Sequence, residues 1–192
     1  MFSCYFLKKI LISVIFGVFF FKSALAENNL VIEVEGEASG TIEITLLPDL
    51  APLHVERIKA LANDGLYDGV VFHRVIDGFM AQTGDVKFGN SSNKDFDLNR
   101  AGMGGSDHPD LKAEFSNLPH EKGVLSMARS SDPDSANSQF FICLETASHL
   151  DRNYTVFGKV TKGMEFVEKI KKGDGPNGSV SNPDKILSFK SK

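Results

Sequence analysis

Short segments in which apolar residues recur at every second position dominate this chain. The first two, residues 30–35 (LVIEVE) and 41–46 (TIEITL), are separated by Gly36 and residues 38–40 (ASG). A period of two places the apolar side chains on one face of an extended strand. Two such runs joined by turn-forming residues predict an antiparallel hairpin with one buried face. The chain is therefore expected to build a sheet from its first folded residues onward.

Strands outnumber helices in the rest of the pattern. Apolar residues at helical spacing predict one helix over residues 53–62, ended by residues 63–65 (NDG), and a second over residues 164–171. The regular strand-helix alternation that builds parallel sheets is missing, and there is no internal repeat. We expect a mostly β fold, a closed antiparallel barrel of seven or eight strands capped by two α-helices. The further expected strands are residues 70–75, 79–82, 124–128, 139–144, 155–160 and 185–189.

The first 26 residues have the pattern of a secretory signal peptide. Lys8 and Lys9 precede an uncharged apolar run, residues 10–21 (ILISVIFGVFFF), and residues 24–26 (ALA) supply the small residues of a cleavage site. An uncleaved membrane anchor is the alternative, but this run is short for a hydrocarbon core that needs about 20 residues. We expect cleavage after Ala26, one domain over residues 27–192 and no stable membrane anchor. The expected location is the periplasm of a bacterium with two membranes, with the extracellular medium second.

The charge of the chain argues against a nucleic-acid partner, and its cysteine content argues against a disulfide. Of the 21 Lys and Arg residues, Lys8, Lys9 and Lys22 leave with the signal peptide, so 18 remain against 25 Asp and Glu and the formal net charge is -7. Non-specific binding to nucleic acid needs a basic face, so no nucleic-acid partner is expected. Cys143 would be the one cysteine left, which excludes an intramolecular disulfide. Its apolar neighbours predict a small buried side chain.

Residues 72–85 (FHRVIDGFMAQTGD) place one cation beside apolar and amide side chains. Strand alternation puts Met80 and Gln82 on the same face, with Arg74 and Phe79 close in sequence. An arginine keeps its proton, because its pKa lies above about 12, so it donates hydrogen bonds and cannot act as a general base. This string alone allows two interpretations. Arg74 is either a surface residue whose alkyl stem packs on the edge of the core, or a fixed donor beside a dry cavity.

Residues 124–144 (VLSMARSSDPDSANSQFFICL) and 149–160 (HLDRNYTVFGKV) favour the second interpretation. Together with residues 72–85 they resemble, in order and spacing, the cyclophilin family of peptidyl-prolyl isomerases, over nearly the whole chain after residue 26. The resemblance implies a closed eight-stranded antiparallel barrel with a helix at each end and an active groove on its outer wall. It also implies peptidyl-prolyl cis-trans isomerase activity on X-Pro bonds during the folding of exported proteins.

The site residues of that family fall on ten positions of this sequence. The resemblance implies that Arg74, Gln82 and Phe79 are catalytic, and that Phe79 also belongs to the pocket for the proline ring. The other seven positions are expected to bind substrate, either in this pocket or along its border. They are Met80, Ala128, Arg129, Phe141, His149, Leu150 and Tyr154.

Three of these positions depart from the best-known eukaryotic pattern. His149 stands where that pattern has a tryptophan, Tyr154 where it has a histidine, and Arg129 where an asparagine is common. Such substitutions resemble the exported bacterial branch of the family and leave the catalytic residue types in place. The missing indole removes a hydrogen-bond donor and a broad apolar surface, so cyclosporin is expected to bind with weakened affinity.

The expected reaction breaks no covalent bond. Rotation of the X-Pro bond removes amide resonance, and the prolyl nitrogen then regains a lone pair that can accept a hydrogen bond. A guanidinium that donates to this nitrogen stabilises only the transition state, and Arg74 is the candidate. The expected partners are proline-containing segments of exported proteins, with no cofactor and no metal, and the protein is expected to be a monomer. The rival hypothesis is a non-catalytic binding module or holdase chaperone that recognises the same segments.

Other motifs carry weaker signals. His108, Asp110, Glu114 and His120 are residue types that bind metals, but their spacing matches neither H-x-x-x-H nor H-E-x-x-H. Residues 173–178 (GDGPNG) satisfy G-x-G-x-x-G, yet they contain a proline and open no helix, so a surface loop is expected. A serine hydrolase is not excluded by composition, although no G-x-S-x-G motif occurs.

Overall fold

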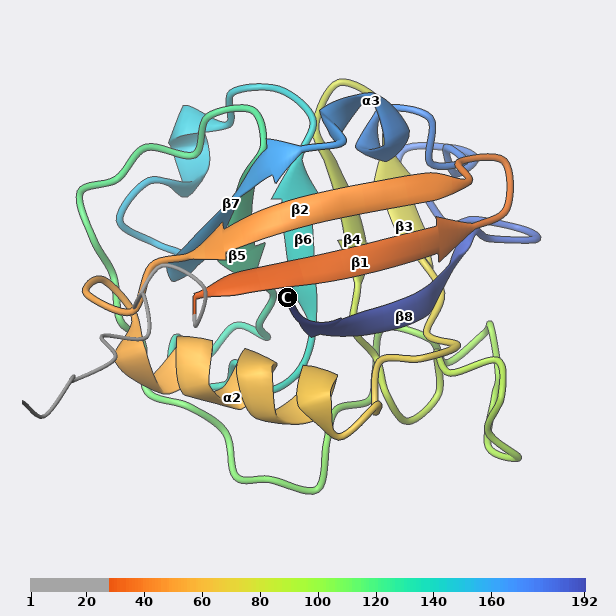
Figure 1. Ribbon diagram of the computed structural model, residues 1–192, viewed down its shortest axis with the longest axis horizontal. Helices are drawn as coiled ribbons and strands as arrows, with labels where there is room; N and C mark the ends of the chain where they lie inside the picture. The colour runs from red at the N-terminus through yellow and green to blue at the C-terminus, as the bar shows by residue number, and fades with distance from the viewer. Residues whose placement is uncertain (1–27) are drawn as a thin grey trace, which may run out of the picture.

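The computed structural model describes residues 28–192, so the expected signal peptide and its cleavage site after Ala26 lie outside the described residues. Eight strands, two α-helices and one 3-10 helix follow one another in this range (Figure 1). No helix within it combines the length and the apolar composition that crossing a bilayer requires. The elements are β1 (Asn29–Glu35), β2 (Gly40–Leu46), α2 (Pro52–Asn63), β3 (Arg74–Ile76), β4 (Met80–Thr83), β5 (Val124–Met127), β6 (Phe140–Cys143), the 3-10 helix η1 (Ser148–Leu150), β7 (Val156–Lys162), α3 (Met164–Val167) and β8 (Lys185–Ser191).

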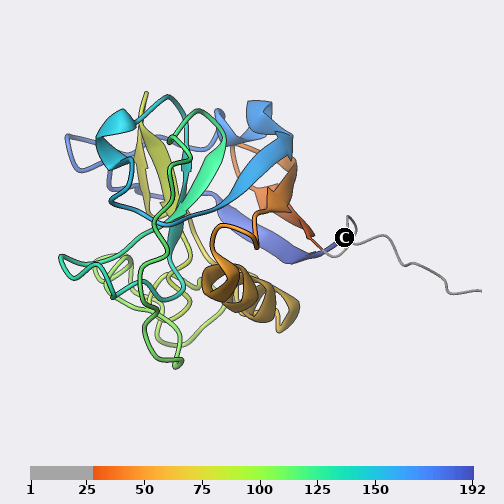
Figure 2. The same ribbon diagram turned by 90° about the vertical axis from the view of Figure 1, so that its left-hand side faces the viewer.

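The eight strands form one antiparallel sheet in the order β3-β4-β6-β5-β7-β2-β1-β8. This sheet is open and curled (Figures 1 and 2), so the expectation of a closed barrel is not confirmed. Its edge strands β3 and β8 form no ladder with each other. The two edges are joined by backbone contacts between residues 69–72 and 184–186, where Val71 pairs with Lys185. The Phe72 N–H donates to the Asp184 carbonyl over 2.9 Å, and the Ile186 N–H donates to the Val70 carbonyl over 2.8 Å. These contacts precede β3, whose three residues begin at Arg74 and therefore do not extend the pairing.

The hairpin and the first helix match the sequence-based expectation. β1 pairs with β2 in a continuous register that runs from Asn29 and Thr45 to Val34 and Gly40. Helix α2 begins with Pro52, whose missing N–H has no intrahelical partner to lose in the first turn. This helix packs against β7 and β8, and α3 packs against β2 (Figure 1).

Three elements differ from expectation. The strand predicted over residues 70–75 is confined to β3, because Val70 and Val71 form only isolated bridges. The helix predicted over residues 164–171 ends as α3 at Val167, and the Lys171 N–H donates to the Asp184 carboxylate over 2.9 Å instead of extending it. The helix η1 was not predicted, because three residues are too few to show a helical period.

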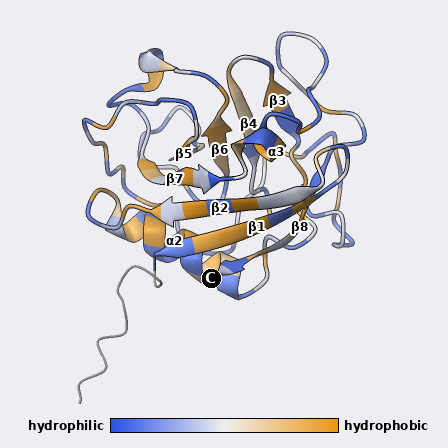
Figure 3. Cartoon of the chain, turned by 45° about the horizontal axis from the view of Figure 1, so that its top comes forward, coloured by the Kyte–Doolittle hydropathy of each residue, from blue (hydrophilic) through white to orange (hydrophobic). Residues whose placement is uncertain are grey.

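The wall built from β4, β5 and β6 is apolar on both faces. On β6, Phe140 and Ile142 belong to the main core, whereas Phe141 and Cys143 belong to a second apolar cluster. The alternation of side chains along the strand explains this division, because neighbouring residues point to opposite faces. Figure 3 shows β6 coloured as hydrophobic. The second cluster, which also contains Met80 of β4, supplies a packed apolar surface on the side of the wall that faces away from the main core.

Three histidines are buried in the folded protein. Burial lowers the pKa of His54, His73 and His120, because the imidazolium form loses its hydration. The carboxylates of Glu114 and Asp151 oppose this effect at His54 and His120. The pKa of His73 falls to about 4. Between this pH and the pKa of about 6.5 of an unfolded histidine, the unfolded chain binds more protons, so lowering the pH destabilises the fold.

We therefore predict that the free energy of unfolding falls as the pH is lowered from 7 to 4.5, and that His73→Gln removes roughly 2 kcal/mol of this fall. Urea unfolding of both proteins at the two pH values measures the difference. The exposed His108 provides the control, because His108→Gln should leave the pH dependence unchanged. The same pH dependence in the His73→Gln protein and the wild type would contradict the prediction.

Candidate active site

A cavity of about 330 Å³ lies over the second apolar cluster, on the outer side of the wall. Met80 and Gln82 of β4 face it together, as strand alternation predicts. The structure brings together around this one cavity all ten positions named by the family resemblance, and their individual roles remain predictions. The lining residues are Arg74, Phe79, Met80, Gln82, Ala128, Arg129, Phe141, His149, Leu150 and Tyr154.

Arg74 is held by two oxygen atoms that carry no net charge. It begins β3 directly opposite Gln82 in the β3–β4 register. Its Nη1 donates to Oε1 of Gln82 over 3.1 Å, and its Nε donates to the backbone carbonyl of Asn177 over 2.9 Å. Within residues 28–192, Nη2 has no hydrogen-bond partner and no carboxylate pairs with this guanidinium. The side chain is thus restrained and still has a charged donor to offer to a ligand.

The floor of the cavity is apolar and closely packed. Met80, Phe141 and Leu150 form it, with exposed fractions of 1%, 5% and 7%. The half-buried ring of Phe79 lies 5.3 Å from the exposed ring of His149, measured between centroids, so these two side chains form one edge. An apolar ring that enters the cavity would lose contact with water against this floor.

The second arginine of the cavity, Arg129, has its donors occupied. Its Cζ lies 4.5 Å from the centroid of the Tyr154 ring, which is a cation–π contact. Its Nη2 donates to the Asn153 carbonyl and its Nη1 to the Ser130 carbonyl, each over 2.9 Å, and Nε also donates to Asn153 over 3.3 Å. Arg129 therefore fastens the rim of the cavity and is less free than Arg74 to donate to a ligand.

Two groups that position Arg74 and Gln82 were not identified from the sequence. Oε1 of Gln139 accepts a hydrogen bond from Nε2 of Gln82 over 3.1 Å. The carbonyl that holds Arg74 belongs to Asn177, within the glycine-rich segment that was predicted to be only a surface loop. The one signal for Gln139 was its place two residues before Phe141, which strand alternation puts on the same face. A backbone carbonyl leaves no signal in the sequence.

A second cavity, of about 550 Å³, adjoins the first and shares Gln82, Ala128 and Arg129 with it. Gln139 and residues 102–106 also line this second cavity. The two adjoining cavities together exceed the volume that a single side chain would fill.

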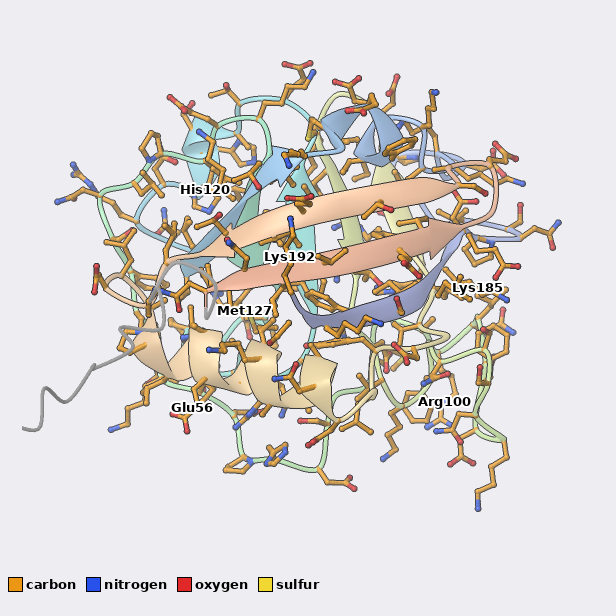
Figure 4. The ribbon with its side chains drawn as sticks, viewed as in Figure 1. Glu56, Arg100, His120, Met127, Lys185 and Lys192 are labelled. Atoms are coloured by element: carbon orange, nitrogen blue, oxygen red, sulfur yellow. The ribbon has the colours of Figure 1, made fainter. Side chains whose placement is uncertain are left out.

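Ser126, His120 and Asp151 form a hydrogen-bonded series of the kind found in serine hydrolases. The His120 ring lies 3.0 Å from the Ser126 hydroxyl through Nε2 and 3.0 Å from the Asp151 carboxylate through Nδ1. Ser126 is fully buried, and its hydroxyl donates to the Thr155 carbonyl over 3.0 Å, so no substrate can reach it. His120, labelled in Figure 4, stacks on Phe141 with the ring centroids 6.3 Å apart. The series supports the cavity floor and is not a hydrolytic site.

The candidate metal ligands do not gather in one place. Glu114 pairs with His54 over 2.6 Å, and His120 pairs with Asp151. Within residues 28–192, no three His, Cys, Asp or Glu side chains form a group that could hold a metal ion. Burial raises the pKa of the Cys143 thiol to about 12, so this buried thiol stays protonated and is not a nucleophile.

Proteins of known family are similar to this chain in sequence. The family model described as cyclophilin type peptidyl-prolyl cis-trans isomerase matches residues 30–191. A probable peptidyl-prolyl cis-trans isomerase of Brucella suis is 55% identical over 162 residues, which are 84% of this chain and 81% of the relative. Peptidyl-prolyl cis-trans isomerase B of Bacillus subtilis is 41% identical over 140 residues, which are 72% of this chain and 88% of the relative.

Solved structures share the fold. The cyclophilin AquaCyp293 from Hirschia baltica has a TM-score of 0.71 at 25% identity, covering 86% of this chain and 74% of that chain. A Cryptosporidium parvum cyclophilin, solved in the presence of the dipeptide Ala-Pro, has a TM-score of 0.70 at 24% identity, covering 85% of this chain and 98% of that chain. With the family match over residues 30–191 and a relative at 55% identity, the chain belongs to the cyclophilin family and is a peptidyl-prolyl cis-trans isomerase.

Proposed function

We propose that Arg74 accelerates X-Pro isomerisation by donating a hydrogen bond to the prolyl nitrogen of the twisted peptide bond. In the planar amide the lone pair of this nitrogen is delocalised, and it becomes an acceptor only as the bond rotates. A donor that is satisfied only at this point lowers the transition state without tightening the binding of the ground state. The main support is that Arg74 lines the cavity and that its Nη2 has no hydrogen-bond partner in residues 28–192, while its Nη1 and Nε are held.

The required magnitude is within reach of one charged donor and good orientation. Rotation costs about 18 to 20 kcal/mol in amide resonance. Lowering this barrier by about 7 kcal/mol accelerates the reaction roughly 10⁵-fold. A charged hydrogen bond strengthens in apolar surroundings, because the local dielectric is low. Met80, Phe141 and Leu150 supply these surroundings and immobilise the proline ring, with Phe79 at its edge, so that only the preceding acyl group rotates.

We propose proline-containing polypeptide segments as the substrates. The apolar floor suits a pyrrolidine ring, and the adjoining cavity leaves room for flanking residues. The Cryptosporidium parvum relative was solved in the presence of the dipeptide Ala-Pro, which has the same chemistry. Gln82 would orient the polar groups of the peptide backbone, since its amide lies between Arg74 and Gln139 at the junction of the two cavities.

We propose that these substrates are exported proteins and that the enzyme itself is exported. The support comes from the first 26 residues, in which two lysines, an apolar run and a small-residue cleavage site follow in the order of a signal peptide. The periplasm is the proposed location, with the extracellular medium second.

We also propose cyclosporin as a ligand of weakened affinity. His149 lies at the rim beside Phe79, where the best-known eukaryotic pattern has a tryptophan. An imidazole covers less apolar surface than an indole, so part of the contact with a bulky apolar ligand is missing.

Arg74→Ala is predicted to lower kcat/KM for an X-Pro peptide about 10²- to 10³-fold, because it removes the donor to the prolyl nitrogen. A protease-coupled assay measures this, and calorimetry with a proline-containing peptide should show a loss of affinity below about tenfold. For comparison, Arg129→Ala should leave kcat nearly unchanged, because the nitrogens of Arg129 already have partners. It should mainly raise KM, because Arg129 fastens the rim of the cavity. Unchanged turnover in the Arg74→Ala protein would contradict the proposal.

His149→Trp is predicted to strengthen cyclosporin binding about tenfold, which corresponds to roughly 1.4 kcal/mol of added contact. Inhibition of isomerisation by cyclosporin measures the change. Leu187→Trp is the control, since Leu187 is exposed on β8 and lines neither cavity. Equal inhibition of the wild type and the His149→Trp protein would show that the absence of an indole at this position is not what weakens cyclosporin binding.

Expression of the whole chain in a bacterium with two membranes is predicted to yield a periplasmic protein that begins at Glu27. Fractionation followed by mass spectrometry of the intact protein identifies both the compartment and the first residue. Changing Ala24 and Ala26 to arginine should leave the signal segment attached. Recovery of the unchanged chain in the membrane fraction, with Met1 or its neighbour at the N-terminus, would instead establish an uncleaved anchor.

A further inference from the structure

Asp85 is a fully buried carboxylate just beyond β4 for which the proposed mechanism has no use. Its Oδ1 accepts the backbone N–H groups of Lys87 over 3.0 Å and Phe88 over 2.9 Å. Its Oδ2 accepts those of Gly102 over 2.8 Å and Gly104 over 2.9 Å. No lysine or arginine within residues 28–192 forms an ion pair with it. Four backbone donors therefore satisfy this charge, and hydrogen bonds to a charged acceptor are the stronger kind.

The two glycines that bind Asp85 leave no room for side chains. A Cβ on Gly104 would lie 2.5 Å from Oδ1 of Asp85. A Cβ on Gly102, whose φ is +97°, would lie 2.9 Å from Nε2 of His73. Glycine is needed at both positions for the chain to close on the carboxylate. Asp85 thereby fixes the backbone of residues 102–104.

The carbonyl oxygens of the same two glycines hold the side chain of Gln139. Its Nε2 donates to Gly102 over 3.0 Å and to Gly104 over 2.7 Å. Its Oε1 accepts from Nε2 of Gln82, whose own Oε1 accepts from Nη1 of Arg74, both over 3.1 Å. A continuous series of contacts thus runs from the buried carboxylate through residues 102–104 and two amides to the guanidinium.

The ends of this series fix the orientation of both amides. A guanidinium can only donate, so Gln82 must turn its oxygen to Arg74 and its nitrogen to Gln139. Backbone carbonyls can only accept, so Gln139 must turn its nitrogen to the two glycines. If residues 102–104 moved away, the Gln139 amide could reverse and present its NH₂ group to Gln82. The oxygen of Gln82 could then accept from Gln139 instead of from Arg74.

We propose that Asp85 is a positioning residue for Arg74 and acts through residues 102–104, Gln139 and Gln82. The proposal rests on the proposed function, because the position of the guanidinium affects turnover only if Arg74 acts on the substrate. A glutamine side chain has several rotatable bonds, so Gln82 alone would hold Arg74 loosely. When both amides are held between two fixed ends, the Gln82 side chain loses this rotational freedom before the substrate binds. A supporting contact raises the rate of catalysis by such preorganisation.

Asp85→Asn tests the proposal, because it keeps the size of the side chain but removes its charge and turns an NH₂ group toward backbone donors. We expect kcat/KM to fall about tenfold through kcat, with KM changed less than about twofold. In a Gln139→Ala background the series is already broken, so the same substitution should cost less than about twofold. A tenfold loss in both backgrounds would overturn the proposal.

The Nε–H signal of Arg74 in NMR spectra reports on the guanidinium independently of catalysis. This group donates to the Asn177 carbonyl, and we expect Asp85→Asn to speed its exchange with solvent at least about threefold. An unchanged signal in a folded Asp85→Asn protein would overturn the proposal. A changed signal would support positioning even if Arg74→Ala kept full turnover, a result that would refute the proposed function alone.

Asp184→Asn is the matched control. Asp184 is also buried and accepts the N–H groups of Glu37 over 2.7 Å and Lys171 over 2.9 Å. Unlike Gly102 and Gly104, these two partners line neither cavity. Its substitution should destabilise the fold without changing kcat or the Arg74 signal, and an equal change there would overturn the proposal. If Asp85→Asn does not fold, Gly104→Ala replaces it with the same expected outcomes, because the added Cβ forces residues 102–104 off the carboxylate.

Discussion

Arg74 can offer its charge to a substrate because the atoms that hold it carry no net charge. A carboxylate partner would attract the guanidinium by several kcal/mol in a cavity of low dielectric and would compete with the peptide for its donors. The oxygen of Gln82 and the carbonyl of Asn177 restrain the side chain without this competition. Asp85 also leaves the guanidinium without a charged partner, because backbone N–H groups already bind its carboxylate.

The apolar half of the site depends on a wall that is packed on both faces. Phe140 and Ile142 anchor β6 in the main core, and Phe141 can therefore stand on the outer face without becoming mobile. The buried series of Ser126 and His120 supports the same floor, because His120 stacks on Phe141 and Ser126 lies opposite Phe141 in the β5–β6 register. The outer surface thus presents an apolar floor beside a restrained cation, which is the combination that the proposed action of Arg74 on a rotating bond requires.

The sequence predicted those parts that depend on local periodicity. The β1–β2 hairpin and α2 were predicted because their patterns extend over several residues. The ten cavity positions were predicted from the resemblance to a known family, and strand alternation by itself placed only Met80 and Gln82 on one face. The closed barrel was not confirmed, because closure depends on how two distant edges meet, which no local pattern encodes. The roles of Gln139 and Asn177 in holding Gln82 and Arg74 were not predicted, for a related reason. Their partners come from segments far away in the sequence, and one of the groups is a backbone carbonyl.

The most direct measurement of the central claim is a crystal structure of the enzyme with a proline-containing peptide. The account predicts that the proline ring lies on Met80, Phe141 and Leu150, with a guanidinium nitrogen of Arg74 within about 4 Å of the prolyl nitrogen. The contacts of Arg74 with Gln82 and Asn177 should persist in that complex. A proline ring seated in the larger adjoining cavity, or an Arg74 side chain turned onto a carboxylate of the peptide, would contradict it.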